Sequence, residues 1–363
     1  MMNQNNDLID NEILNLKSLD NYFEDLHRNF SLASTNLGGT FSFDFKLANK
    51  KIIISSAGER LLRLTTQALA HLEAEKIELI EKPFVIYTWD EKEANIPLPE
   101  HPWITPEDIV EDSFVQFHLE NYFVSQFDNQ TILFLYNFKE NVAFCIIKDA
   151  NNLNNSFLSS PFFKLIALWA SKQSLNILHA GCVSVNNKGV LIVGRSGKGK
   201  SSTSVQCAID GLDYLSDDYI LIDDTGEKTI AYSIFNSGKL KLNHIERFNK
   251  IQSSISIGNL DQNNKPLLFL STIFKEQIKR STEIKAIIVP NITSSVSANY
   301  YRISSLEALK ALAPSTLVQL RINGLNELKS LADLTRKFPN FCLELGSDFE
   351  DISFKVKKII EEI

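Results

Sequence analysis

The stretch VLIVGRSGKGKSS, residues 190–202, places a loop rich in glycine and lysine directly after a short apolar run. The run VLIV predicts a buried strand, and residues 199–210 predict a helix that ends with Gly211 in the C′ position. Between them, residues 194–201 match the pattern G-x-x-x-x-G-K-[ST] at every defined position. A glycine-rich surface turn can match by chance, but the strand–loop–helix order predicts a phosphate-binding loop.

Each residue type in this loop suits the binding of phosphate. The glycines let the backbone approach an anion closely, so that its N–H groups and the start of the helix face the phosphates. Lys200 is predicted to reach the outer phosphates and act in catalysis, and the hydroxyl of Ser201 to bind Mg²⁺. We therefore predict ATP and Mg²⁺ as cofactors. The predicted nucleotide-binding residues are Gly194, Arg195, Ser196, Gly197, Lys198, Gly199, Lys200, Ser201 and Ser202.

Composition narrows the class of protein. The chain has 363 residues and a formal net charge of -7, so we expect two or three domains and no nucleic-acid partner, because no basic face is evident. Its apolar runs are too short to span a bilayer, and its polar first residues resemble neither a signal nor a transit peptide, so no membrane partner is expected. The four cysteines are scattered, which favours reduced thiols in a cytoplasmic protein.

The chain is predicted to divide at the loop-like segment DANNLNNS, residues 149–156. Residues 1–30 predict a helical segment with a frayed start, since apolar side chains recur at helical spacing. Residues 31–155 predict a small α+β domain, and residues 156–363 a domain built on the phosphate loop. The predicted fold class is therefore α/β, with an N-terminal α+β domain followed by a P-loop domain with a mixed sheet.

Local patterns predict the elements of each domain. The first is expected to contain a hairpin at 40–56, a helix at 57–74, a strand at 83–89 and three strands between 113 and 148. The second is expected to contain a helix at 161–171, a hairpin at 177–194 that turns at NNKG, and strands at 214–224, 229–235, 286–290 and 341–345. Ser304 and Glu307 fit a capping box, and further helices are predicted at 327–337 and from residue 351.

Two adjacent carboxylates, Asp217 and Asp218, begin a predicted apolar strand, where they are costly if buried without partners. Near a phosphate loop, a metal ion and a nucleophile explain both, because a kinase needs a metal ligand and a carboxylate within reach of the acceptor hydroxyl. The simpler alternative is that one of them only caps the strand. His179 lies in the strand that pairs with the loop's own strand, so its side chain is either near the phosphates or hydrogen-bonded in the core.

The segments LHAGCVSVNNKGVLIVGRSGKGKSS and GLDYLSDDYIL resemble the catalytic domain of HPr kinase/phosphorylase, a serine kinase whose P-loop fold is akin to phosphoenolpyruvate carboxykinase. The resemblance is closer to HPr-kinase-related kinases found beside peptide-modification genes, including those of lasso-peptide pathways. Those kinases share later motifs that appear here as YSIFNSGKL, LAPSTLVQL and FPNFCLELG. The resemblance is specific over residues 177–221 and looser to residue 346, and it implies an HPr-kinase-like domain over residues 156–363.

By position, this resemblance implies a role for each candidate residue. Asp217 is implied to be the acid/base residue, Asp218 to support the metal or the base, and His179 to be the active-site histidine. Lys239 is implied to touch a phosphate or the substrate, with a solvated turn lysine as the alternative. The glycine- and arginine-rich segment that HPr kinases use for phosphorolysis and hexamer contacts has no convincing counterpart, so neither property is carried over.

Two classes of function follow from these features. The first is an ATP- and Mg²⁺-dependent kinase of a serine or threonine hydroxyl on a peptide or small protein, with a kinase of a free small molecule, such as an amino acid, as a near relative. The second is a nucleotide-gated binding module without phosphoryl transfer. The paired aspartates favour an enzyme, because a switch needs only one. Residues 31–150 carry no motif for chemistry and are expected to recognise the acceptor. The acceptor's identity, ATP versus GTP and a homo-oligomer stay open.

Overall fold

The computed structural model describes residues 16–74, 81–99, 115–127, 131–239, 266–320 and 324–363. Its contacts divide the chain into two compact units. Unit 1 comprises residues 1–67 and 73–153, and unit 2 comprises residues 68–72 and 154–363. Both units combine helices with a sheet of mixed strand direction, so the predicted α/β class is confirmed. The frayed start predicted within residues 1–15 lies outside the described residues.

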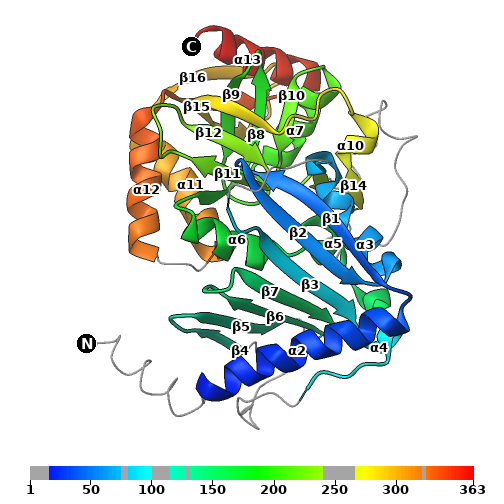
Figure 1. Ribbon diagram of the computed structural model, residues 1–363. Helices are drawn as coiled ribbons and strands as arrows, with labels where there is room; N and C mark the ends of the chain where they lie inside the picture. The colour runs from blue at the N-terminus through cyan, green and yellow to red at the C-terminus, as the bar shows by residue number, and fades with distance from the viewer. Residues whose placement is uncertain (1–15, 75–80, 100–114, 128–130, 240–265, 321–323) are drawn as a thin grey trace. The chain divides into compact units, whose positions relative to one another are not determined.

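Unit 1 is built on a seven-stranded sheet in the order β1-β2-β3-β7-β6-β5-β4 (Figure 1). The strands are β1 Thr40–Leu47, β2 Lys50–Ala57, β3 Phe84–Asp90, β4 Val115–His118, β5 Tyr122–Phe127, β6 Ile132–Asn137 and β7 Val142–Ile147. Strand β3 runs parallel to β2 and β7, and the other neighbours are antiparallel. Helix α2, Leu16–Asn36, places apolar residues every three or four positions, and its Leu26 and Phe30 share a buried core with Trp89 and Phe144 of the sheet.

The hairpin predicted at residues 40–56 is confirmed, with positive φ angles of 47° and 64° at Ala48 and Asn49 in its turn. Two other predictions for unit 1 need correction. The helix expected at 57–74 is α-helical only in α3, Glu59–Thr66, and continues as the 3₁₀ helix η1, Gln67–Leu72. The described residues between 113 and 148 form four strands, and not three, because β5 forms an additional antiparallel pair with β4. The segment YFVSQF lacks the regular alternation that would have indicated this strand.

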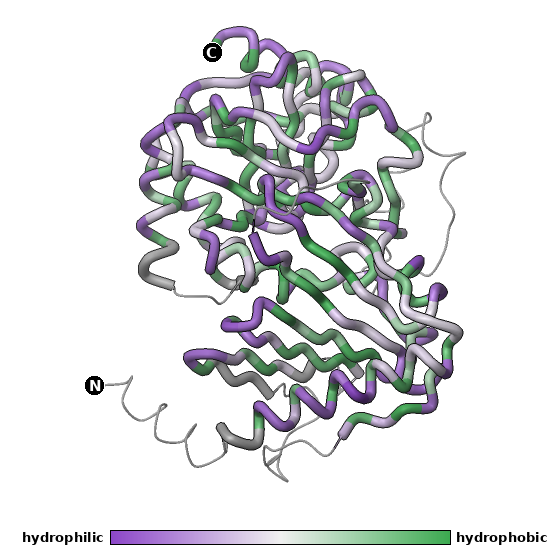
Figure 2. Tube along the Cα trace, in the orientation of Figure 1, coloured by the Kyte–Doolittle hydropathy of each residue, from purple (hydrophilic) through white to green (hydrophobic). Residues whose placement is uncertain are grey.

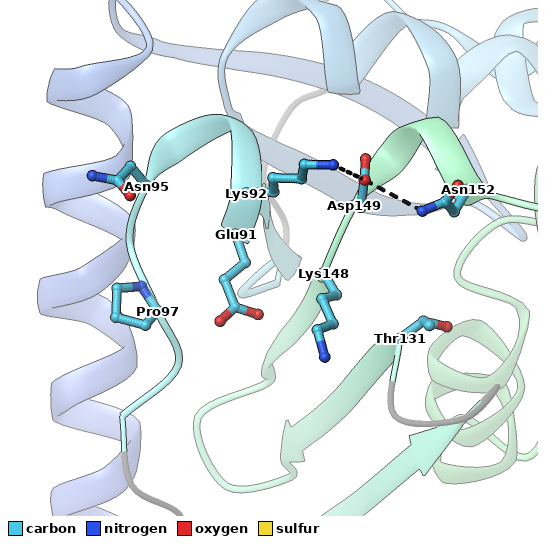
Figure 3. A pocket seen from close by; sticks show the side chains of 8 residues that line it. All are labelled: Glu91, Lys92, Asn95, Pro97, Thr131, Lys148, Asp149 and Asn152. Carbon is cyan, nitrogen blue, oxygen red and sulfur yellow. Dashed lines mark hydrogen bonds and ion pairs between the residues drawn. The ribbon is translucent and has the colours of Figure 1, made fainter. Parts of the chain in front are cut away.

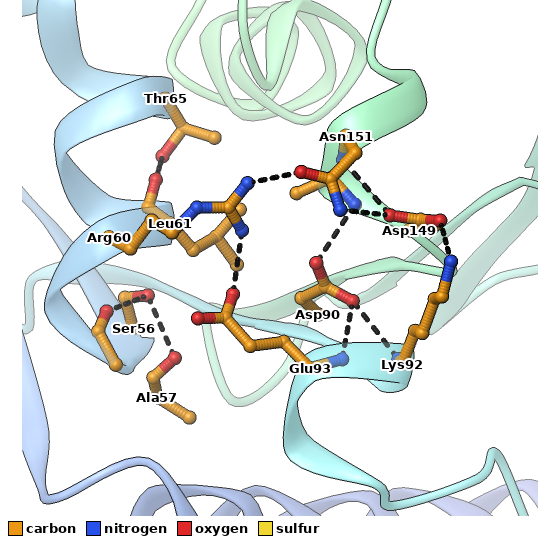
Figure 4. Close-up of polar contacts among 12 residues, drawn as sticks. Ser56, Ala57, Arg60, Leu61, Thr65, Asp90, Lys92, Glu93, Asp149 and Asn151 are labelled. Atoms are coloured by element: carbon orange, nitrogen blue, oxygen red, sulfur yellow. Dashed lines mark hydrogen bonds and ion pairs between the residues drawn. The ribbon is translucent and has the colours of Figure 1, made fainter.

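A buried carboxylate holds the short helix α4, Glu91–Ala94, at the end of β3 (Figure 4). The carboxylate of Asp90 accepts the N–H groups of Lys92 and Glu93 at 3.0 Å and of Ala150 at 2.8 Å. Three hydrogen bonds offset the cost of taking this charge out of water. Asp90 is therefore explained as a structural residue of unit 1.

Unit 2 is built on an eight-stranded sheet in the order β10-β8-β11-β12-β15-β17-β16, in which β9 pairs with both β8 and β15. The strands are β8 Asn176–Val185, β9 Lys188–Val193, β10 Asp213–Ser216, β11 Tyr219–Asp223, β12 Ile230–Ser233, β15 Ser281–Ile292, β16 Asn299–Ile303 and β17 Asn340–Leu345. Strand β15 runs parallel to β9 and β17, and the other pairs are antiparallel.

Helices cover two separate cores of this sheet (Figure 1). Helices α11, Ser305–Leu320, and α12, Gly324–Lys337, pack on one core, while α7, Lys200–Ile209, and α13, Phe349–Glu361, pack on the other. Figure 2 shows hydrophobic residues following the strands between them. The remaining elements of unit 2 are α5 Asn155–Ser159, α6 Phe163–Lys172, α10 Leu270–Ile273 and a small sheet of β13 Ser237–Lys239 and β14 Leu267–Phe269.

Several local predictions for unit 2 are confirmed. Strands β8 and β9 form the expected hairpin, with φ of 50° and 61° at Asn186 and Asn187. Gly211 has φ of 87°, as a residue in the C′ position requires. The capping box is present, because the N–H of Ser304 donates to Glu307 at 2.9 Å and the N–H of Glu307 donates to the Ser304 hydroxyl at 3.3 Å.

The prediction of one strand over residues 214–224 is wrong. Two strands, β10 and β11, occupy this segment, and Asp217 and Asp218 lie in the turn between them. The physical reason is that β10 and β11 both pair with β8, so the chain leaves one ladder at Ser216 and enters the next at Tyr219. The two carboxylates therefore stand outside the sheet ladder and do not begin a strand.

Gly181 determines how closely α7 packs on β8. A Cβ at this position would lie 2.3 Å from the Ser204 Oγ of α7 and 3.3 Å from the Ser216 carbonyl oxygen. A carbon atom that close to the serine oxygen requires the Ser204 side chain to rotate or α7 to move away from the sheet. Because α7 begins at the phosphate loop, Gly181 also helps to fix the loop above β8.

Gly181→Ala is expected to lower the free energy of unfolding by about 1–3 kcal/mol, the usual range for overpacking a core. Adding Ser204→Ala removes the oxygen that the new methyl group meets, so the double variant should recover much of the loss. Urea denaturation of the wild type, both single variants and the double variant measures these differences. A Gly181→Ala protein as stable as the wild type would show that α7 is not held this close to β8.

Candidate functional site

Residues 194–199 form the loop between β9 and α7. Within it, residues 195–198 are exposed, whereas Gly194 is buried. Gly197 and Gly199 have φ of 80° and 100°, a conformation that glycine adopts without strain. Gly199 is the N-cap of α7 and has no side chain to accept the first helical N–H groups. This arrangement presents backbone donors and the positive end of the helix dipole to an anion.

The side chain of Lys200 folds back over the loop. It is 5% exposed, and its Nζ donates to the Gly194 carbonyl at 2.7 Å and to the Arg195 carbonyl at 3.4 Å. These carbonyls offset part of the cost of burying the ammonium group. A phosphate oxygen is a stronger partner for an ammonium than a neutral carbonyl is. The contact of Lys200 with a phosphate stays a prediction.

Asp217 and Asp218 contact different partners. The Asp218 Oδ1 lies 2.9 Å from Nε2 of His179, and the Asp218 side chain is 37% exposed. Asp217 is only 3% exposed, and its Oδ1 accepts a hydrogen bond from the Tyr214 hydroxyl at 3.2 Å. The structure thus brings His179 to the second aspartate of the pair and gives the first aspartate a buried tyrosine.

The turn that carries the aspartates is held by short-range hydrogen bonds. The Ser216 Oγ donates to the Tyr219 carbonyl at 2.7 Å and accepts the Asp218 N–H at 3.2 Å. Burial, together with the negative charge of Asp217, raises the pKa of Tyr214 well above its usual range. The tyrosine therefore stays protonated and remains a hydrogen-bond donor to Asp217.

Strand β8 brings the loop and the aspartate turn to the same place. Ala180 lies opposite Val193, the last residue before the loop, and His179 lies opposite Tyr219, the first residue after the aspartates. These two positions are adjacent along β8. From α11, the Thr316 Oγ1 accepts the backbone N–H of His179 at 3.3 Å. The predicted histidine, aspartates and loop are therefore neighbours in the fold, while their chemical roles stay predictions.

Lys239 and Ser201 are two further residues predicted to bind nucleotide or metal. Lys239 is the last residue of β13 and lies opposite Leu267 of β14, and its contact with phosphate or substrate stays a prediction. Ser201 is half-buried in the first turn of α7. Among the described residues, no group of three or more His, Cys, Asp or Glu side chains could hold a metal ion. Hydroxyl and carboxylate oxygens are nevertheless the donors that Mg²⁺ prefers when it is bound largely through nucleotide phosphates.

Sequence reasoning missed a half-buried histidine that supports the aspartate turn. His71 groups with unit 2, and its Nε2 lies 2.8 Å from the Ser233 Oγ. That hydroxyl donates to the Leu215 carbonyl at 2.6 Å, so its only proton is committed and His71 Nε2 is the donor. His71 Nδ1 then accepts from Asn236 Nδ2 at 3.3 Å. The chain of hydrogen bonds ends at Leu215, two residues before Asp217. No local sequence pattern around residue 71 indicates this role of the histidine.

Unit 1 contains a cavity of about 630 Å³ (Figure 3). Its lining residues are Glu91, Lys92, Asn95, Pro97, Thr131, Lys148, Asp149 and Asn152. Charges of both signs meet here, and Lys92 pairs with Asp149 at 2.6 Å. These residues include no nucleophile with an adjacent base, so the loop of unit 2 remains the stronger candidate for chemistry. No helix among the described ranges is long and apolar enough to cross a membrane.

No protein-family model matches the chain, and no curated protein matches it either. Among solved structures, the chain is similar to the HPr(Ser) kinase/phosphatase from Coxiella burnetii. The two share 13% sequence identity, the match covers 52% of this chain and 95% of that chain, and the TM-score is 0.29. Similarity at this level establishes neither a family nor an activity for this chain.

His71 predicts a pH dependence of stability. Burial of its ring, with the Arg280 guanidinium nearby, lowers its pKa to about 3. An unfolded histidine titrates near about pH 6.5, so below that value the unfolded state binds more protons and acidification favours unfolding. When the pH falls from about 7 to 5.5, the free energy of unfolding of His71→Gln is expected to decrease by about 1 kcal/mol less than that of the wild type. Urea denaturation at both pH values measures this, and an identical pH dependence in the two proteins would contradict it.

Proposed function

We propose that the chain is an ATP- and Mg²⁺-dependent kinase that transfers the γ-phosphoryl group to a serine or threonine hydroxyl of a peptide or small protein. The observation that carries this proposal is the arrangement along β8. His179, which contacts Asp218, is next along β8 to Ala180, and Ala180 lies opposite Val193, the last residue before the loop. A phosphate loop that only binds nucleotide needs one carboxylate, whereas a kinase also needs one for the acceptor hydroxyl.

The loop supports the nucleotide half of the proposal. Backbone N–H groups at glycine positions and the start of α7 supply fixed positive ends of dipoles, and Lys200 Nζ already lies over the loop on the Gly194 carbonyl. Groups that are in place before the substrate arrives need no reorganisation when charge develops on the phosphoryl group. Positioning of this kind supplies most of the catalysis in phosphoryl transfer.

Ser201 and Asp218 are the proposed protein ligands of Mg²⁺. When bound, the ion would neutralise charge on the transferring phosphoryl group. Asp218 suits this role because it is the more exposed aspartate of the pair, at 37%, and because His179 fixes one of its oxygens at 2.9 Å. The pair is thus oriented from the protein side before any cation is present.

Asp217 is the proposed base. Its burial shields it from bulk water, and the Tyr214 hydroxyl orients its carboxylate. In the proposed reaction Asp217 takes the proton of the acceptor hydroxyl, the acceptor oxygen forms a bond to the γ-phosphorus, and the bond to ADP breaks. Lys200 faces the phosphates during this exchange and compensates their negative charge.

Unit 1 is proposed to recognise the acceptor, because remote binding energy positions a peptide for in-line attack. Strand β1 is the first strand of its sheet, and its outer edge is bridged at Phe45 by Glu73, so an extended peptide can add to the remainder of that edge. A kinase of a free small hydroxyl compound uses the same site without this contribution. A nucleotide-gated binding module is the alternative outside the enzyme class, and the two aspartates with separate partners count against it.

Lys200→Ala is expected to weaken Mg·ATP binding by roughly 10- to 100-fold, because it removes a charge-assisted hydrogen bond to phosphate. Isothermal titration calorimetry measures the dissociation constant. Lys275→Ala removes an exposed lysine outside the loop and serves as the matched control, with an expected change within about twofold. A wild-type protein that binds no Mg·ATP would contradict the nucleotide site itself.

Asp217→Asn and Asp218→Asn are expected to impair different properties, the rate of phosphoryl transfer in the first and the Mg²⁺ dependence of ATP binding in the second. Asp217→Asn should keep Mg·ATP affinity within a few-fold and lower the rate of ADP release with a serine peptide library by ~10²–10⁴, the loss expected for a positioned base. Asp218→Asn should instead raise the Mg²⁺ concentration needed for tight ATP binding. The reverse pattern, with the Mg²⁺ dependence altered only in Asp217→Asn, would exchange the two roles.

A further inference from the structure

Three parallel strands end at one edge of the unit 2 sheet. Strand β15 pairs in parallel with both β9 and β17, and Ile292 lies opposite Leu345 at the ends of β15 and β17. Because the three chains run in the same direction, the loop after Val193 and the segments after Ile292 and Leu345 leave the sheet at the same edge. Ligands of open α/β sheets bind outside the carboxyl ends of parallel strands.

Two exposed aliphatic side chains lie at this edge, which we call the apolar ledge: Ile292, 58% exposed, and Val296, 69% exposed. A Cβ at Gly199 would lie 2.3 Å from Cδ1 of Leu345 and 3.9 Å from Cγ1 of Ile292. The ledge therefore begins directly beside the residue that caps α7. Exposed aliphatic side chains beside the loop offer an apolar surface that part of a ligand can cover.

Backbone contacts fix the ledge in place. The N–H of Thr293 donates to the Leu345 carbonyl at 3.0 Å, and the N–H of Asp348 donates to the Val296 carbonyl at 3.0 Å. A Cβ at Gly346 would lie 2.2 Å from the Val296 carbonyl oxygen, so a glycine is needed for this close approach. Val296 is thus held rigidly in an exposed position, which is how a preformed binding surface is built.

The two edges of β9 separate the candidate chemistry from the ledge. Strand β9 pairs with β8 along one edge and with β15 along the other. The histidine and the aspartate turn belong to the β8 side, and the ledge belongs to the β15 side. If the acceptor approaches phosphates in the loop from the β8 side, the β15 side is left for the remainder of the nucleotide.

We propose that the apolar ledge binds the purine base of the nucleotide. This inference rests on the proposed function, because the loop has to hold the triphosphate of the same ligand. A purine has a broad, weakly hydrated face, and covering the ledge with it removes apolar surface of both partners from water. The base on the ledge then adds to the nucleotide affinity that the phosphates provide.

The ledge also predicts which purines the site accepts. The hydroxyls of Thr293 and Ser295 lie 2.7 Å from each other and are bonded to the carbonyls of Leu345 at 3.1 Å and Ser297 at 2.9 Å. The protons of these two hydroxyls are thus donated within the protein. Apolar surfaces discriminate weakly between ligands that differ in a polar group, so ATP and GTP are expected to bind within about tenfold of each other.

Calorimetry with Mg·ATP, Mg·GTP and Mg·tripolyphosphate tests the ledge apart from the loop. The wild type is expected to bind ATP at least roughly tenfold more tightly than tripolyphosphate. The double variant Ile292→Ser/Val296→Ser should lose about that factor for ATP and keep its tripolyphosphate affinity within about twofold. Leu306→Ser is the matched control, since Leu306 is 58% exposed on α11 and should change neither ligand.

Each outcome decides between the loop and the ledge. If the double variant loses equal affinity for ATP and tripolyphosphate, or loses affinity for neither, the proposal that the base binds at the ledge is contradicted. A wild type that binds tripolyphosphate as tightly as ATP would also overturn it and leave the phosphate loop intact. A wild type that binds neither ligand would overturn the proposed function together with the ledge. If the double variant does not fold, Val296→Ser alone, at the more exposed position, is read by the same criteria.

Discussion

The pairing of β8 along both of its edges is the constraint on which the rest of unit 2 depends. On one edge it fixes β9 and therefore the start of the phosphate loop at Val193. On the other it pairs first with β10 and then with β11, so that the chain has to leave the ladder at Asp217 and Asp218. Gly181 in the same strand admits α7 at close range. One strand thus places the loop, the helix that follows it and both carboxylates.

Three charged groups around this strand are held by partners within the protein. Lys200 rests on the carbonyl of Gly194, Asp218 on the imidazole of His179, and Asp217 on the hydroxyl of a tyrosine. Such partners lower the cost of partial burial without neutralising the site. Charged groups oriented before the reaction begins are the main resource of an enzyme that transfers a phosphoryl group. The parallel strands on the other side of β9 add an apolar surface in place of further charge, which suits a nucleotide whose two ends differ in polarity.

The sequence predicts the parts of this site that are local and misses those that depend on distant pairing. The loop and α7 follow from a contiguous pattern, and the hairpin before them follows from its turn residues. The sequence predicts a strand at the aspartate turn because the turn's geometry arises from two segments that pair with β8, about 35 residues earlier in the chain. Tyr214, His71 and the ledge of Ile292 and Val296 could not be predicted, since their meaning comes from burial and from neighbours far away in the sequence.

Transfer of the γ-phosphoryl group itself tests the central claim most directly. The protein is incubated with Mg²⁺, ATP that carries an isotope label in the γ-phosphoryl group, and a degenerate peptide library with serine as the acceptor. Mass spectrometry then locates the label. A kinase is expected to form labelled phosphoserine together with an equal amount of ADP, because the acceptor oxygen replaces ADP on the phosphorus. Label that appears only in inorganic phosphate, or that remains in ATP bound to the protein, would contradict a kinase and favour a nucleotide-gated binding module.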